Sequence, residues 1–173
     1  MIYNHIIKKL EINAATFKSM LEITSTEQAR WKPSPQRWSL LEVTNHLYDE
    51  EREDFRQRLE NVLEDPQKPW SPIDPQNWVT EREYNQRDMK NSLNKFLIER
   101  EKSIKWLINL RSPDWSATHH HPKLGKMSAE KLLANWLAHD YLHLRQIVFL
   151  QWSYLSDLAP GISLNYAGNL LTQ

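Results

Sequence analysis

His139 and His143 could hold one metal ion between them. They lie one helical turn apart, in a segment whose periodicity predicts a helix. Side chains four residues apart on a helix have Cβ atoms roughly 5–6 Å apart on one face. That span suits two imidazoles whose nitrogens each lie about 2.0–2.1 Å from a zinc-like ion. The pair alone is an incomplete site, and each residue could instead be a core histidine bonded to a neighbouring carbonyl.

The apolar pattern around the pair predicts that both imidazoles face the core. At about 100° per residue, both fall in the arc within about 60° of Trp136 that also holds the apolar side chains of this helix. Those apolar residues are Ala129, Leu132, Leu133, Ile147 and Leu150. Buried imidazoles need partners for their ring nitrogens, and one shared cation would supply two of them. We therefore interpret His139 and His143 as metal ligands.

His46 is the candidate third ligand. In the helix expected around Val43, it lies at the border of the core-facing stripe, where a ligand could enter a cleft. Glu50, four residues later, falls in the middle of that stripe, where a carboxylate is costly unless it is paired. It could be a fourth ligand, an acceptor that orients an imidazole, or a catalytic base acting on a water at the metal. The alternative is a buried salt bridge, for example with Arg145 or Arg100.

These residues need helices to position them, and the sequence predicts an all-α four-helix bundle. Low glycine content and long stretches of 3.6-residue periodicity argue against a β-rich fold. Ser39, with Glu42 as its capping-box partner, and Ser128 are predicted N-caps. Bundles build metal sites in their cores from side chains of facing helices. The expected helices span residues 2–23, 40–63, 88–110 and 128–152.

The connecting segments complete the predicted architecture. Residues 24–37 form a connector, and residues 65–78 hold four prolines and form a long crossover between the second and third helices. Residues 112–126 are expected to be a loop whose tract 119–121 is solvated or lines a cavity entrance, with His121 as its candidate. We expect residues 1–152 to form the bundle. The tail 153–173 would pack on it or on a partner in a homodimer, through Leu164, Tyr166, Leu170 and Leu171.

Composition limits the classes of function. Lys plus Arg and Asp plus Glu each total 22, so no basic excess indicates nucleic acid and no charge block indicates a membrane surface. The chain has no cysteine, which excludes disulfides, a thiolate metal site and a cysteine nucleophile. No segment resembles a secretory signal or a membrane span. We expect a cytoplasmic protein.

The residues named so far also resemble a known family. Trp38-Ser39, Asn45-His46-Leu47 with Asp49-Glu50-Glu51, His121-Pro122-Lys123-Leu124-Gly125, and His139-Asp140 with His143-Leu144-Arg145-Gln146-Ile147 are similar to the DinB-like superfamily (the DinB/YfiT group). The resemblance covers about residues 1–152. It implies a four-helix bundle that binds one divalent metal through three histidines, here His46, His139 and His143. Characterised relatives include thiol-dependent S-transferases and isomerases.

Three classes of function remain after these observations. The first is a metalloenzyme with an open coordination position, where a water or a low-molecular-weight thiol would become a nucleophile. It would be a transferase acting on an electrophile held against Trp38, Trp136 or the crossover, or else a hydrolase with Glu50 as base. The second is a non-catalytic bundle, either a sensor of a metal or small molecule or one braced by a closed structural metal site. The third is an interaction module acting through the tail. We expect zinc or nickel as the metal.

Overall fold

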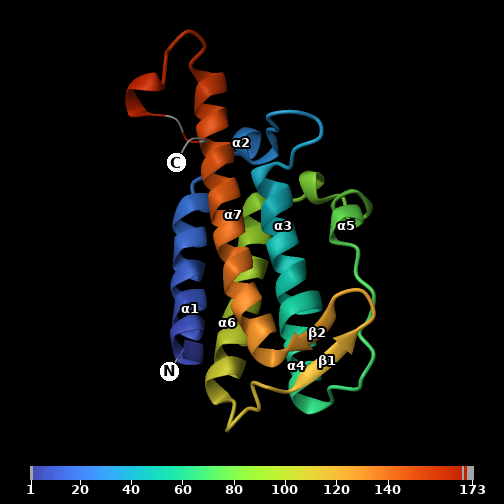
Figure 1. Ribbon diagram of the computed structural model, residues 1–173. Coiled ribbons are helices and arrows are strands. Elements are labelled where there is room, and N and C mark those ends of the chain that lie inside the picture. The colour runs from blue at the N-terminus through green and yellow to red at the C-terminus, as the bar shows by residue number, and fades with distance from the viewer. Residues whose placement is uncertain (1, 169, 171–173) are drawn as a thin grey trace.

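The computed structural model describes residues 2–168 and 170, and four long helical rods dominate it (Figure 1). Three of the rods are single helices. The remaining rod is interrupted by a π-helical turn, Glu51–Phe55. The rods are α1 (Ile2–Leu21), α3 (Leu40–Glu50) continued by α4 (Arg56–Glu64), α6 (Met89–Asn109) and α7 (Ala129–Leu158). The predicted four-helix bundle is confirmed.

The proline-rich crossover determines how the rods run. Figure 1 shows α1 and α7 running one way and both α3–α4 and α6 running the other way. The chain leaves α4 at one end of the bundle and must return to the opposite end before α6 begins, which is why a long crossover is needed. Short helix α5 (Pro75–Glu81) forms near its end, with Asp74 as N-cap and proline in its first turn. The crossover therefore lies where the sequence predicts it, but it contains a helix that the sequence analysis did not predict.

Local capping chemistry sets where the rods begin. The Ser39 hydroxyl accepts the Glu42 backbone N–H, and the Glu42 carboxylate accepts the Ser39 N–H, which completes the predicted capping box. Ser128 caps α7 by accepting the Lys131 N–H, and Asp88 caps α6. Because the capping box fixes the start of α3, it also fixes the rotation at which His46 leaves the helix seven residues later.

The apolar core runs through the bundle in two neighbouring clusters. One cluster joins α1, α4, α6 and α7 around Trp136, and the other joins α1, α3, α6 and α7 around Phe17 and Phe96. The rings of Phe17 and Phe96 meet edge to face with centroids 5.4 Å apart. The two helices with candidate ligands, α3 and α7, therefore pack against the same two helices, α1 and α6.

Besides α5 in the crossover, four features differ from the sequence predictions. The connector after α1 contains a short helix, α2 (Thr26–Arg30), capped by Ser25. The expected loop 112–126 contains an antiparallel hairpin of β1 (Thr118–His121) and β2 (Gly125–Ser128). Gly125 adopts φ +70°, which a glycine turn residue permits without strain. α7 continues six residues past its predicted end at Trp152. The fourth difference is the π-turn, which a regular 3.6-residue pattern does not contain.

The tail after α7 lies beyond the main body of the bundle (Figure 1). Tyr166 is fully exposed, whereas Leu164 and Leu170 are half-buried. Leu171, the remaining apolar tail residue, lies outside the described residues. The homodimer expected from this segment stays a prediction. Within residues 2–168 and 170, no helix combines the length and apolar character needed to cross a membrane.

Candidate metal centre

Three imidazoles converge where α3 faces α7. The Nε2 atom of His139 lies 3.2 Å from Nε2 of His46 and 3.0 Å from Nε2 of His143. The ligand nitrogens of all three lie within 4.8 Å of one another. Two nitrogens about 2.0–2.1 Å from a tetrahedral zinc-like ion would be about 3.3–3.4 Å apart, so the donor spacing fits such an ion closely. The structure thus brings together the three residues that the sequence singled out. In the described part of the chain they are the only group of three or more such donors that converges in this way.

Neighbouring side chains hold the imidazoles in this orientation. The Nδ1–H of His143 donates to Oε1 of Gln146 at 2.8 Å, because an amide oxygen can only accept. That bond leaves the lone pair of His143 Nε2 facing the other two rings, as a metal ligand requires. The His46 ring contacts Trp38 with centroids 4.9 Å apart, and His139 contacts Phe55 of the π-turn at 5.0 Å. Aromatic packing therefore restricts the orientation of the His46 and His139 rings, while Gln146 orients His143.

Burial keeps the three imidazoles neutral. His46 and His143 are 5% and 4% exposed, and His139 is half-buried. Desolvation, followed by repulsion from His143, lowers the pKa of His46 to about 3. Burial likewise lowers the pKa of His139 well below its ordinary value, with His143 and His46 adding to the effect, and burial lowers the pKa of His143. Neutral imidazole is the form that binds a cation.

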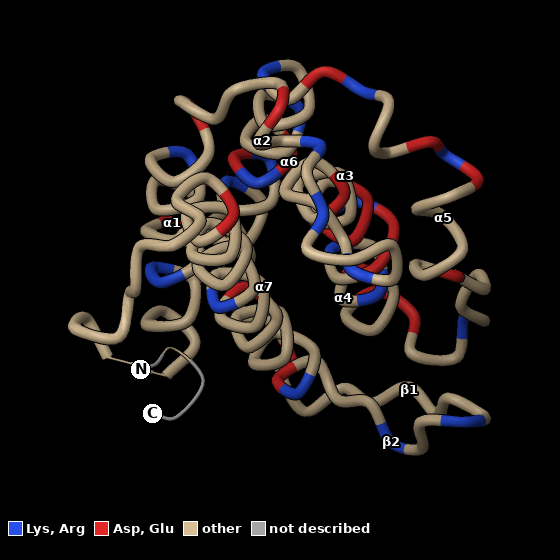
Figure 2. The backbone as a smooth tube through the Cα atoms, turned by 90° about the horizontal axis from the view of Figure 1, so that it is seen from above, with Lys and Arg blue, Asp and Glu red and all other residues tan. Residues whose placement is uncertain are grey.

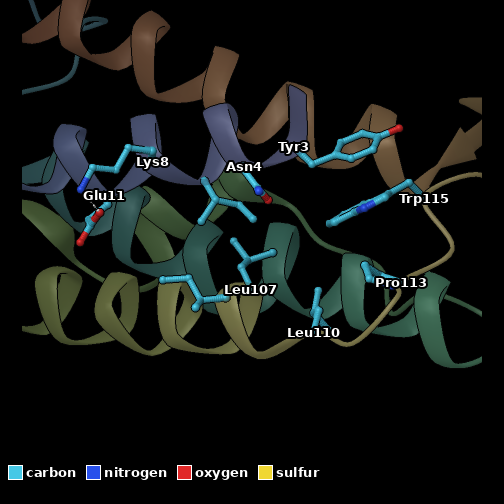
Figure 3. Close-up of a pocket in the computed structure, with 10 residues that line it drawn as sticks. Tyr3, Asn4, Lys8, Glu11, Leu107, Leu110, Pro113 and Trp115 are labelled. Carbon is cyan, nitrogen blue, oxygen red and sulfur yellow. Dashed lines mark hydrogen bonds and ion pairs between the residues drawn. The ribbon is translucent and has the colours of Figure 1, made fainter. Parts of the chain in front are cut away.

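The centre opens into a pocket of about 1060 Å³. All three histidines line it, together with Trp38, the start of α5 and the outer face of α7. A smaller cavity of about 400 Å³ lies elsewhere, between α1, α6 and the segment around Trp115 (Figure 3). Its walls carry a stacked Tyr3–Trp115 pair and a Lys8–Glu11 ion pair, but no histidine. Of these two cavities, only the large one gives a ligand access to the histidines.

A family model matches the sequence, and a solved structure shares the fold. A family model of the DinB superfamily matches residues 9–147, a span that contains all three histidines. The chain belongs to the DinB superfamily. Among solved structures, YfiT from Bacillus subtilis superposes with a TM-score of 0.76 at 20% sequence identity, covering 86% of this chain and 85% of that chain. YfiT is described as "a probable metal-dependent hydrolase with an unusual four-helix bundle topology". A comparison with curated proteins found no match.

In this DinB-superfamily chain, Glu50 lies apart from the three converging donors. It is 5% exposed, and its Oε1 has no hydrogen-bond partner. It is neither a member of the histidine group nor part of the pocket lining. Desolvation, followed by the nearby Asp54 carboxylate, raises the pKa of Glu50 to about 9, so the side chain carries a proton at neutral pH. Its catalytic role stays a prediction, and a protonated carboxyl would serve as an acid rather than as a base.

The buried ion pair proposed for Glu50 belongs instead to the next residue. Arg100 on α6, 1% exposed, lies 2.9 Å from Glu51 of the π-turn and 2.7 Å from Asp140 of α7. The Trp136 indole also donates to Glu51, at 3.0 Å. Arg145 is exposed and forms no ion pair within the described residues. The Arg100 network sits between the π-turn and α7, and it therefore fixes their relative position next to His139. Sequence reasoning missed the network because its charged residues lie on three elements far apart in the chain, and helical periodicity does not report which remote side chains meet.

Two other expected site features lie away from the pocket. Trp136 is buried in the core and stacks on Phe55, with centroids 5.8 Å apart, so it cannot hold a substrate. His119 stacks on Trp70 at 4.4 Å and donates Nδ1–H to the Pro66 carbonyl at 2.9 Å. His121 accepts two backbone N–H groups of its own turn through Nδ1. The histidine tract thus ties the hairpin to the crossover and does not line the pocket.

Proposed function

We propose that this chain is a metal-dependent enzyme in which His46, His139 and His143 hold one divalent cation, zinc or nickel. The main support for this proposal is that three neutral imidazole nitrogens converge at metal-ligand spacing beside a large pocket. Imidazole donors suit both metals. Structural zinc sites usually have four protein ligands, whereas catalytic sites have three and one open position. The count of three therefore supports catalysis over a purely structural or sensing role.

Each protein group has a defined task in this proposal. Gln146 holds the tautomer of His143, and Trp38 and Phe55 fix the other two rings. A divalent cation held there would supply Lewis acidity, which would lower the pKa of a water or thiol bound beside it. The second substrate would lie in the pocket against Trp38 and the start of α5.

The pocket lining favours transfer to a small thiol over hydrolysis. No Asp or Glu occurs among the described residues that line it, so no carboxylate base adjoins the open position. A free thiol has a pKa of about 8.5, far below the value of about 15.7 for water, and needs less help to ionise. We therefore propose a thiol-dependent S-transferase that uses an external low-molecular-weight thiol. Hydrolysis is the second candidate, supported by the description of YfiT.

Cobalt substitution separates the two reactions. Cobalt(II) replaces zinc in histidine sites and gives a thiolate charge-transfer absorption when a thiol binds it. We expect N-acetylcysteine to produce this band in cobalt-loaded protein near neutral pH and the His143→Ala variant to lack it. The matched probe N-acetylserine should give no such change. Absence of the band at saturating thiol, together with metal-dependent cleavage of an activated ester, would reject S-transfer in favour of hydrolysis.

A further inference from the structure

Two arginines line the same pocket as the three histidines. Arg37 lies just before the N-cap of α3, and Arg145 lies on α7, two residues after His143. Both are exposed, and neither has a carboxylate within ion-pair distance in residues 2–168 and 170. Two arginines from different elements thus line one pocket.

Most other arginines near the bundle core are already neutralised. Acidic residues concentrate along the α3–α4 rod, as Figure 2 shows, and there they pair with arginines. Five arginines lie within 3.0 Å of a carboxylate oxygen: Arg52, Arg56, Arg58, Arg82 and Arg100. Five arginines have no carboxylate partner within the described residues, and of these only Arg37 and Arg145 line the large pocket. Their charge is therefore available to a ligand.

The rest of the lining is neutral. Gln36, Gln76 and Gln146 supply amides, while Trp38 and Phe149 supply aromatic surface. With no acidic side chain in the described lining, two arginines make the pocket electropositive, and a cation on the histidines would add to that field. Guanidinium groups match the planar carboxylate and the phosphate group by paired N–H donors.

We propose that the pocket binds substrates that carry an oxyanion, a carboxylate or phosphate, on an apolar body, with Arg37 and Arg145 contacting the oxyanion. The apolar body lies against Trp38 and Phe149, which directs the rest of the molecule toward the histidines. As a statement about substrates, this inference rests on the proposed metal-dependent function. The binding site itself is a property of the arginines and can be measured without turnover.

Calorimetric titration with benzoate, benzamide and phenyl phosphate tests the proposal on purified, metal-loaded protein at low ionic strength. Benzamide has the shape of benzoate without its charge. We expect benzoate or phenyl phosphate to bind at least tenfold more tightly than benzamide, and the tighter of the two anions identifies the group recognised. Arg37→Gln and Arg145→Gln should each weaken anion binding about fivefold, as expected for roughly 1 kcal/mol from a partly solvated ion pair. Binding of benzamide should not change.

Arg111→Gln is the matched control, since Arg111 is exposed, makes no ion pair within the described residues and lines neither cavity. Anion affinity that is equal in wild type, Arg37→Gln and Arg145→Gln, or equal for benzoate and benzamide, would overturn the inference. Elemental analysis of the same samples separates the two proposals. Full metal content with arginine-independent anion binding rejects only the anion site. Arginine-dependent binding in a protein that cannot hold metal rejects only the metal centre.

Discussion

Replacing Glu50 by glutamine should stabilise the protein, and the gain should grow as the pH rises. Glu50 is buried beside Asp54, with Oε1 unpartnered. Glutamine keeps the shape of the protonated side chain and cannot ionise. The wild-type carboxyl, by contrast, must either keep its proton or place a charge in a desolvated site next to another carboxyl.

The sign and size follow from the two pKa values of Glu50. The carboxyl ionises near 4.5 in the unfolded chain, whereas burial raises its pKa to about 9 in the folded protein. Between these values the unfolded state loses a proton that the folded state retains. The stability contributed by the protonated Glu50 side chain is therefore fully present below pH 4.5, and it is lost as the pH rises toward 9. The slope reaches about 1.4 kcal/mol per pH unit, so the advantage of Glu50→Gln should increase by about 2–3 kcal/mol from pH 6 to pH 8.

Urea denaturation of metal-free protein at pH 6, 7 and 8, followed by circular dichroism, measures this difference. Glu64→Gln is the control, because Glu64 is exposed and has no ion pair within the described residues. Its effect should stay within about 0.5 kcal/mol at every pH. The reasoning would be refuted by a Glu50→Gln stability difference that is constant across the three pH values.

Three further substitutions probe the groups that surround the histidines. Arg100→Met leaves two buried carboxylates without their partner and should cost about 3–5 kcal/mol of unfolding free energy in urea denaturation, with a neutral result counting against the buried network. Gln146→Ala removes the acceptor of His143 Nδ1–H and should weaken zinc binding about 10–100-fold in a chelator competition, while thermal stability changes little. Ser39→Ala breaks the α3 capping box and should lower stability by about 1 kcal/mol, whereas Ser39→Thr, which keeps a hydroxyl that can cap and can donate to Asn85, should retain most of it.

The sequence predicted the parts of the fold that depend on local rules. Ser39 and Ser128 cap helices as expected, because capping needs only a side-chain oxygen and the next backbone N–H groups. His139 and His143 face inward together because the apolar stripe of α7 turns with them. His46 could be paired with them because a bundle core allows few partners for an inward imidazole pair.

The missed features depend on contacts between distant segments. Glu50 is buried as helical spacing predicted, but Arg100, considered in the sequence analysis as its partner, pairs with the neighbouring Glu51. The β1–β2 hairpin is held by His119 packing on Trp70 of the crossover, a contact between segments about 50 residues apart in the chain. Its short strands carry little pattern of their own. Sequence periodicity reports which face of an element is apolar and not which remote segment covers it.

Metal content tests the central claim most directly. Purified wild-type protein, His46→Ala, His139→Ala and His143→Ala would be loaded with zinc or nickel, desalted and measured by elemental analysis. His120→Ala serves as control, since His120 is exposed on the hairpin and lies outside the site. The account predicts close to one equivalent of metal in wild type and in His120→Ala, and a large loss in the other three variants. Full retention of metal by those three variants would contradict it.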